Sequence, residues 1–182
     1  MQTGTVKFGV RRKGLWLFCF LTLCFVSISL YALLPVGAAS AETADKIVVI
    51  KSEHRMMLLR GNTVLHDYAV SLGRGGKGPK MRSGDHKTPE GSYTIDGRNP
   101  KSHFHLSLHI SYPNATDIQR AREHGFAPGG DIMIHGLQNG LGWIGRFHRV
   151  SDWTDGCIAV TDSEMDQIWR AVPDGTPIEI RP

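Results

Sequence analysis

Short apolar or alternating runs that stop at turn-forming residues fill the chain from residue 46 to residue 181, and this pattern limits the fold more than any other feature. Each run suits a β-strand and is too short for an ordinary core helix. Gly61–Asn62 and Asp174–Gly175 are typical of tight turns. The expected strands are residues 46–51, 56–59, 63–72, 92–95, 104–111, 132–134, 158–160 and 177–181. The sequence therefore predicts a mainly β fold.

Two segments carry helix signals instead. Residues 116–124 are followed by Gly125, and residues 162–171 follow Thr161, which with Glu164 matches a capping box. We expect one β-sandwich or barrel-like domain over residues 46–181, with these two small helices.

Residues 1–41 have the composition of a leader. Four basic residues precede an apolar stretch over residues 14–34, and small residues follow at 38–41. This order predicts a signal peptide or an N-terminal membrane anchor, and therefore an exported protein of the periplasm or cell envelope. We expect cleavage near Ala39 or Ala41, with a retained anchor as the alternative.

The formal net charge of +4 comes from that leader. Residues 42–182 hold 17 basic and 17 acidic residues, because the other four basic residues are Lys7, Arg11, Arg12 and Lys13. A neutral body gives no indication of a nucleic-acid partner. We expect contact with a membrane only through the leader, and a monomer.

Cys157 is the only cysteine beyond the leader, since Cys19 and Cys24 lie within it. An unpaired thiol in an exported protein is either buried in the core or retained for chemistry. Gly156 precedes it and an apolar run follows, so a sharp turn could expose the thiol at a strand edge. Backbone N–H groups of Gly156 and Cys157 would then be candidate donors to an oxyanion.

His135 ends a strand-like run and is followed by Gly136. A lone histidine is more often structural, but a neutral imidazole close to a thiol can take its proton and stabilise the thiolate. We therefore predict Cys157 as nucleophile and His135 as general base. The carbonyl of Gly136 is expected to orient the imidazole.

Three motifs occur in an order known from one family: Lys-Thr-Pro-Glu-Gly-Ser-Tyr-Thr-Ile at residues 87–95, Ile-His-Gly at 134–136 and Gly-Cys-Ile at 156–158. In these the chain resembles the L,D-transpeptidase (YkuD-like) catalytic domain over residues 46–181. The resemblance implies a β-rich catalytic domain whose cysteine attacks peptidoglycan stem peptides, with a thioester intermediate and the histidine of the second motif as base. It implies no cofactor and no metal.

Two positions depart from the family pattern. Asp155 stands where the family usually has histidine, and Ala159 stands where it often has a substrate-binding arginine. We expect Arg146 or Arg149 to supply the missing cation. We also expect one of them to pair with Asp155 and hold its loop; the alternative is that Asp155 receives the side-chain amine of an acceptor.

The acceptor that resolves the thioester is open. An amine of a second stem peptide would give a cross-link, a lysine of a wall-attached protein would give attachment, and water would give hydrolysis. A thiol or zinc hydrolase of the same linkages and a non-catalytic wall-binding module are therefore alternatives.

Three further segments have a second interpretation. His103, His105 and His109 could share one strand face and bind zinc, although a half-buried strand with a polar face is expected. Residues 73–79 are glycine-rich, which indicates a loop and not a phosphate site, because no helix and no Gly-Lys-Ser/Thr follow. Trp143, Trp153 and Trp169 are expected to anchor core and loops, with a glycan-stacking surface as the alternative.

Overall fold

The computed structural model describes residues 1–5 and 42–182. The predicted leader lies almost wholly at residues 6–41, outside the described residues, so the signal peptide or anchor stays a prediction. Among the residues that are described, no helix combines the length and the apolarity needed to cross a membrane.

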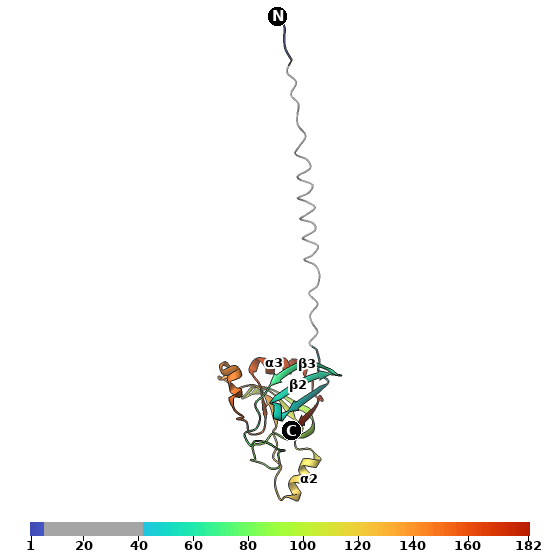
Figure 1. The fold of residues 1–182 in the computed structure, drawn as a ribbon, viewed down its shortest axis with the longest axis vertical. Helices are drawn as coiled ribbons and strands as arrows, with labels where there is room; N and C mark the ends of the chain where they lie inside the picture. The colour runs from blue at the N-terminus through green and yellow to red at the C-terminus, as the bar shows by residue number, and fades with distance from the viewer. Residues whose placement is uncertain (6–41) are drawn as a thin grey trace. The chain divides into compact units, whose positions relative to one another are not determined.

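Eight strands form one sheet, in the order β3-β2-β1-β8-β4-β5-β6-β7. Figure 1 shows this domain and labels several of its elements. The strands are β1 (Lys46–Ile50), β2 (Arg55–Arg60), β3 (Thr63–Ala69), β4 (Gly91–Ser102), β5 (His105–Ile110), β6 (Met133–His135), β7 (Ile158–Ala159) and β8 (Pro177–Arg181). The predicted mainly β fold is confirmed.

The chain that follows β3 joins the two ends of this strand order. Ser71 exchanges backbone hydrogen bonds with Ala159 of β7, and Gly73 bridges to Thr154 just before that strand. Because β3 and β7 are the first and last strands of the order, these bridges curl the sheet into a barrel-like shape. They also hold the chain in place on both sides of Cys157, at Thr154 before it and at Ala159 after it.

Aliphatic side chains from several strands form one buried core cluster. Alternation in β1 buries Ile47 and Val49, and the antiparallel β2 contributes Met56 and Leu58 to the same cluster. Each such side chain contributes about 1.5–3 kcal/mol when it leaves water. Burial of these side chains therefore stabilises the sheet. The candidate site residues lie at strand ends and in loops.

Both predicted helices are present: α2 (Ala115–Glu123) and α3 (Asp162–Ala171), at opposite ends of the domain in Figure 1. The capping box of Thr161 and Glu164 is confirmed. Helix α3 packs on β5 and β6, with Met165 and Ile168 in the core. This packing places its first residue beside the segment that follows β6.

Four features differ from the sequence expectation. Strand β4 continues to Ser102, because turn-forming residues after Ile95 still pair with β5 through irregular register. Strand β3 ends at Ala69, because the next residues turn toward β7. Two 3-10 segments, η1 (Lys51–Glu53) and η2 (Gly142–Val150), were not predicted. Gly145, at φ +51°, interrupts η2, so its sequence has no continuous helical pattern of apolar residues.

Candidate active site

His135 occupies the end of β6 in a fixed orientation. Its Nδ1 lies 2.7 Å from the carbonyl oxygen of Gly136. A carbonyl can only accept, so Nδ1 carries the proton and donates. The other ring nitrogen, Nε2, is therefore the unprotonated one and can accept a proton.

Aromatic rings surround the imidazole. The ring of Phe104 lies 4.6 Å from it and that of Trp153 lies 5.8 Å away, between centroids. His135 is 5% exposed, and burial lowers the pKa of its imidazole. His135 is consequently neutral at pH 7, the state that a general base requires.

Cys157 lies directly before β7, which pairs in parallel with β6. Ile134 is opposite Ile158, both fully buried, and His135 is opposite Ala159. Since alternate residues share a face, Cys157 emerges on the same face as His135. Strand spacings put their Cα atoms roughly 8 Å apart, which the two side chains together can span.

The thiol of Cys157 is half-buried, with Sγ 3.6 Å from the carbonyl oxygen of Asp131. Burial raises the pKa of this thiol, while a hydrogen bond from the backbone of Met133 acts in the opposite direction. The thiol is therefore protonated at pH 7 and needs a base to become a nucleophile.

The turn before Cys157 depends on Gly156 and Thr154. Gly156 has φ +128°, and a Cβ there would lie 2.8 Å from the carbonyl oxygen of Lys87. The Thr154 hydroxyl donates to the carbonyl of Cys157 at 2.7 Å and accepts the Gly156 N–H at 3.2 Å. That N–H already donates to Thr154, so the N–H of Cys157 is the preferred candidate for an oxyanion donor.

The glycine-rich segment forms a loop, as expected, and packs closely against this turn, because a Cβ at Gly73 would lie only 3.0 Å from the Cα of Gly156. Gly73 donates to the hydroxyl of Thr88 at 2.9 Å, and Gly75 donates to the carbonyl of His86 at 2.8 Å. A Cβ at Gly73 would meet that same His86 carbonyl at 2.2 Å. The backbone of residues 73–75 therefore lies directly against the backbone at His86, and this close approach is possible because glycine has no side chain.

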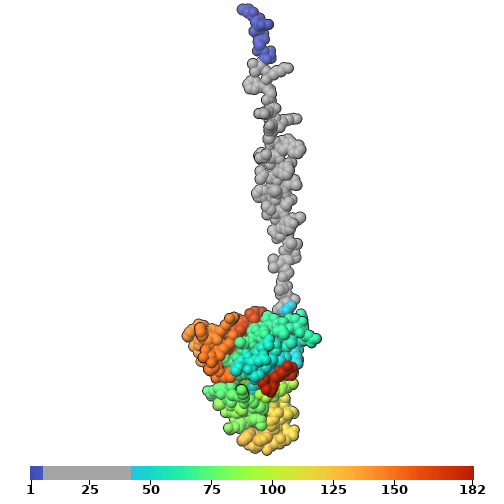
Figure 2. Space-filling view, in the orientation of Figure 1, coloured from blue at the N-terminus to red at the C-terminus, as the bar shows by residue number. Residues whose placement is uncertain are grey.

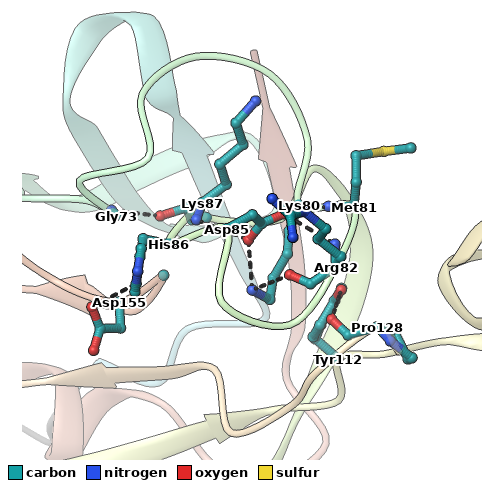
Figure 3. A network of polar contacts seen from close by, with 12 residues as sticks. Gly73, Lys80, Met81, Arg82, Asp85, His86, Lys87, Tyr112, Pro128 and Asp155 are labelled. Atoms are coloured by element: carbon teal, nitrogen blue, oxygen red, sulfur yellow. Dashed lines mark hydrogen bonds and ion pairs between the residues drawn. The ribbon is translucent and has the colours of Figure 1, made fainter. Parts of the chain in front are cut away.

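A buried ion pair fixes the middle of the loop. Lys80 Nζ and Asp85 Oδ1 are 2.8 Å apart, and their side chains are 4% and 10% exposed (Figure 3). Asp85 also accepts the backbone N–H groups of Met81, Arg82 and Lys87. In Figure 2 the loop, in green, lies beside the yellow segment that contains α2, and Ser83 donates to the carbonyl of Ala127 between them.

Asp155 has other partners than predicted. Its carboxylate is 71% exposed and contacts Arg74 at 2.9 Å and His86 at 2.8 Å. The expected pairing with Arg146 or Arg149 is wrong, because both arginines lie elsewhere in the fold. Asp155 instead connects the turn before Cys157 to the glycine-rich loop.

The side chains of Arg149 and Arg146 both lie near α3. Arg149 forms a partly buried ion pair with Glu164. Arg146 lines a cavity of about 570 Å³ together with β3 and the start of α3, and neither Cys157 nor His135 lines it. The geometry gives no support to either arginine as the cation of the cysteine site.

The three histidines considered for zinc do not form one donor set. His105 contacts Asp166, His109 contacts Asp96, and His103 lies in the turn between β4 and β5. Throughout residues 42–182, no group of three histidine, cysteine or acidic side chains is arranged to hold a metal ion.

The three tryptophans have separate environments. Trp153 packs on Phe104 and His135, and Trp169 lies under the guanidinium of Arg98 at 4.0 Å. Trp143 is 82% exposed, so its expected anchoring role is wrong. They do not form one stacking surface.

Sequence reasoning missed Thr154, Phe104 and Asp162 as neighbours of the site. Thr154 lies two residues before the Gly-Cys-Ile motif, so its position was a usable signal. Phe104 and Asp162 reach His135 and Gly136 only through strand pairing and helix packing, which no local pattern discloses.

The family model of the YkuD L,D-transpeptidase catalytic domain matches residues 44–180. YafK of Escherichia coli K12, which carries the name of an L,D-transpeptidase, is 33% identical over 111 residues. This match covers 60% of the chain and 37% of YafK.

Solved structures share the fold. The helical cell shape determining protein Pgp2 from Campylobacter jejuni has a TM-score of 0.59 at 21% identity, over 76% of this chain and 48% of that protein. An L,D-transpeptidase from Xylanimonas cellulosilytica has a TM-score of 0.53 at 14% identity, over 86% of this chain and 69% of that structure. The chain spans less than half the length of YafK and of Pgp2.

Proposed function

Because the chain belongs to the L,D-transpeptidase catalytic domain (YkuD) family, we propose that it is a cysteine acyltransferase acting on peptidoglycan stem peptides. Cys157 is the nucleophile and His135 the general base. One observation carries this proposal: His135 is held in the tautomer that leaves Nε2 free, on the same sheet face as Cys157.

Proton transfer begins the reaction. Sγ of Cys157 rotates from the carbonyl of Asp131 toward Nε2 of His135 and gives up its proton. The aromatic surroundings of the imidazole exclude water, so the resulting thiolate and imidazolium attract each other strongly. This attraction offsets the raised pKa of the isolated thiol.

Acyl transfer then follows in two balanced steps. Sγ forms a bond to a stem-peptide carbonyl carbon, the C–N bond to the leaving residue breaks, and the departing amine takes the proton from Nε2. The backbone N–H of Cys157 stabilises the oxyanion of the tetrahedral intermediate. An acceptor next gives its proton to Nε2, attacks the thioester carbon and releases the thiolate.

The nature of the acceptor defines the biological outcome. A stem-peptide amine gives a cross-link, a protein lysine gives attachment, and water gives hydrolysis. The thiol mechanism is common to all three, and the site acts outside the cytoplasm, where the predicted leader would deliver it.

The test is turnover of a purified disaccharide tetrapeptide by the full chain, with and without an added stem peptide as acceptor. Cys157→Ala and His135→Ala are expected to lose turnover. His105→Ala serves as the matched histidine control, since His105 contacts Asp166 and not the thiol. It should retain turnover.

Product masses separate the outcomes of this test. A dimer identifies a transpeptidase, and a tripeptide alone identifies a hydrolase. Turnover that survives Cys157→Ala but stops with a chelator would instead establish a metal hydrolase and refute the proposal.

A further inference from the structure

One peptide group connects His135 to a carboxylate on another element. The carbonyl of the Gly136–Leu137 peptide accepts the Nδ1–H of His135 at 2.7 Å. The N–H of the same peptide donates to Oδ1 of Asp162 at 2.7 Å. Asp162 is the first residue of α3, and two residues separate it from the end of β7. The carboxylate and the imidazole therefore bind opposite ends of one planar, polarisable group.

The surroundings of Asp162 are shaped to admit its carboxylate. A Cβ on Gly136 would lie 2.7 Å from Oδ1, and a Cβ on Gly142 would lie 2.3 Å from Oδ2. Neither glycine has a positive φ, so close approach and not backbone conformation accounts for both. Two glycines from separate segments thus leave room for the same side chain.

The preceding peptide group, between His135 and Gly136, is also held in place. The N–H of Gly136 donates to the carbonyls of Phe104 and Leu106, at 3.1 and 3.3 Å. The peptide group after Gly136 consequently has little freedom to turn its carbonyl away from the imidazole.

We propose that Asp162 is a positioning residue that orients His135 and raises its basicity through the Gly136–Leu137 peptide. This rests on the proposed function, in which His135 is the base for Cys157. A carboxylate that accepts the peptide N–H draws electron density toward the carbonyl oxygen. That oxygen then accepts the Nδ1–H more strongly and stabilises the imidazolium that forms during catalysis.

Other titratable groups near His135 must be separated from this effect. Cys157 faces it from the β7 side, and His148 of η2, like His135, packs against the ring of Trp153. The pKa of His148 is lowered to about 4 by burial first and then by Arg149, so His148 does not titrate near neutral pH.

The decisive comparison is Asp162→Asn against Asp166→Asn in the full chain. Asn can still accept the Leu137 N–H, so the first variant keeps the geometry and removes the charge. Asp166 is on the same helix, contacts His105 and does not contact Leu137, so the second variant removes an equal charge without the peptide contact. Two readouts apply: the pH dependence of Cys157 alkylation, measured on the peptide that contains Cys157, and the imidazole pKa of His135 by NMR in a Cys157→Ala background.

Asp162→Asn is expected to lower the His135 pKa and to slow alkylation at pH 7 about three- to tenfold, because a hydrogen bond to a charged partner is stronger than one to a neutral partner. Asp166→Asn should change neither. Gly142→Ala, which displaces the carboxylate by contact, should act in the same direction as Asp162→Asn.

Two results distinguish failure of this inference from failure of the proposed function. If His135→Ala slows alkylation and Asp162→Asn matches the wild type or Asp166→Asn, the role of Asp162 is refuted and the cysteine–histidine pair stands. If His135→Ala leaves alkylation unchanged at every pH, the pair itself is refuted.

Discussion

Replacing Asp85 by Ala should destabilise the loop that packs against the turn before Cys157 by about 3 kcal/mol. The change leaves the Lys80 ammonium buried with only the carbonyl of Arg82 as partner, and removal of one member of a buried pair typically costs about 3–5 kcal/mol.

The pKa of Asp85 gives an independent magnitude. Burial alone would raise this pKa, but the hydrogen bonds from Lys80 and from three backbone N–H groups outweigh burial and lower it from 3.8 to about 2. Such a difference corresponds to about 2.4 kcal/mol of stability. Because the folded-state pKa is depressed, this stability is present above about pH 4 and is lost as the pH falls toward 2.

Thermal unfolding and hydrogen exchange measure the effect. A domain of this size should lose about 6–12 °C in Tm, and the loop amides of Gly73 and Gly75 should lose protection first. Asp67→Ala is the matched control: its pair with Arg55 is exposed and is worth less than about 1 kcal/mol. Equal losses for Asp85→Ala and Asp67→Ala would refute the argument from burial.

Three further predictions concern the site and its support. Gly156→Ala should lower the free energy of unfolding by about 2–3 kcal/mol and abolish turnover. Gly76 also has a positive φ but open space around it, so Gly76→Ala should lower the free energy of unfolding by only about 1 kcal/mol. Equal unfolding free energies for the two variants would contradict the steric reasoning. Asp155→Asn should change Tm by less than about 3 °C, because the ion pair of Asp155 with Arg74 is exposed. It should also speed Cys157 alkylation, because the Asp155 charge raises the pKa of the thiol, and slower alkylation would contradict this prediction. Burial lowers the pKa of His148 to about 4, so the unfolded chain takes up a proton there before the folded chain does, and stability should fall as the pH drops from about 6.5 to 4. In melting curves across this range, His148→Asn should reduce the dependence of Tm on pH. An unchanged dependence would contradict this prediction.

Features of the fold that depend on local pattern were predictable. Short apolar runs identified the strands of the first hairpin, and the capping box at Thr161 identified the start of α3. The candidate nucleophile and base were also visible, because Cys157 and His135 stand beside glycines at the ends of strand-like runs.

Features that depend on long-range packing were not predictable. The partners of Asp155 come from a loop far away in the sequence, so the arginines closest in sequence were the wrong choice. In the sequence, Asp162 is typical of an acidic residue in the first turn of a helix. Its contact with Leu137 depends on the packing of α3 against β6, which the local sequence does not indicate.

The most direct measurement is the mass of the intact chain mixed rapidly with a disaccharide tetrapeptide, followed by mapping of the modified residue. The account predicts a transient adduct equal to the donor minus its terminal residue, on Cys157, that is absent in Cys157→Ala and forms more slowly in His135→Ala. Turnover without any adduct on Cys157, or an adduct that forms as fast in His135→Ala as in the wild type, would contradict it.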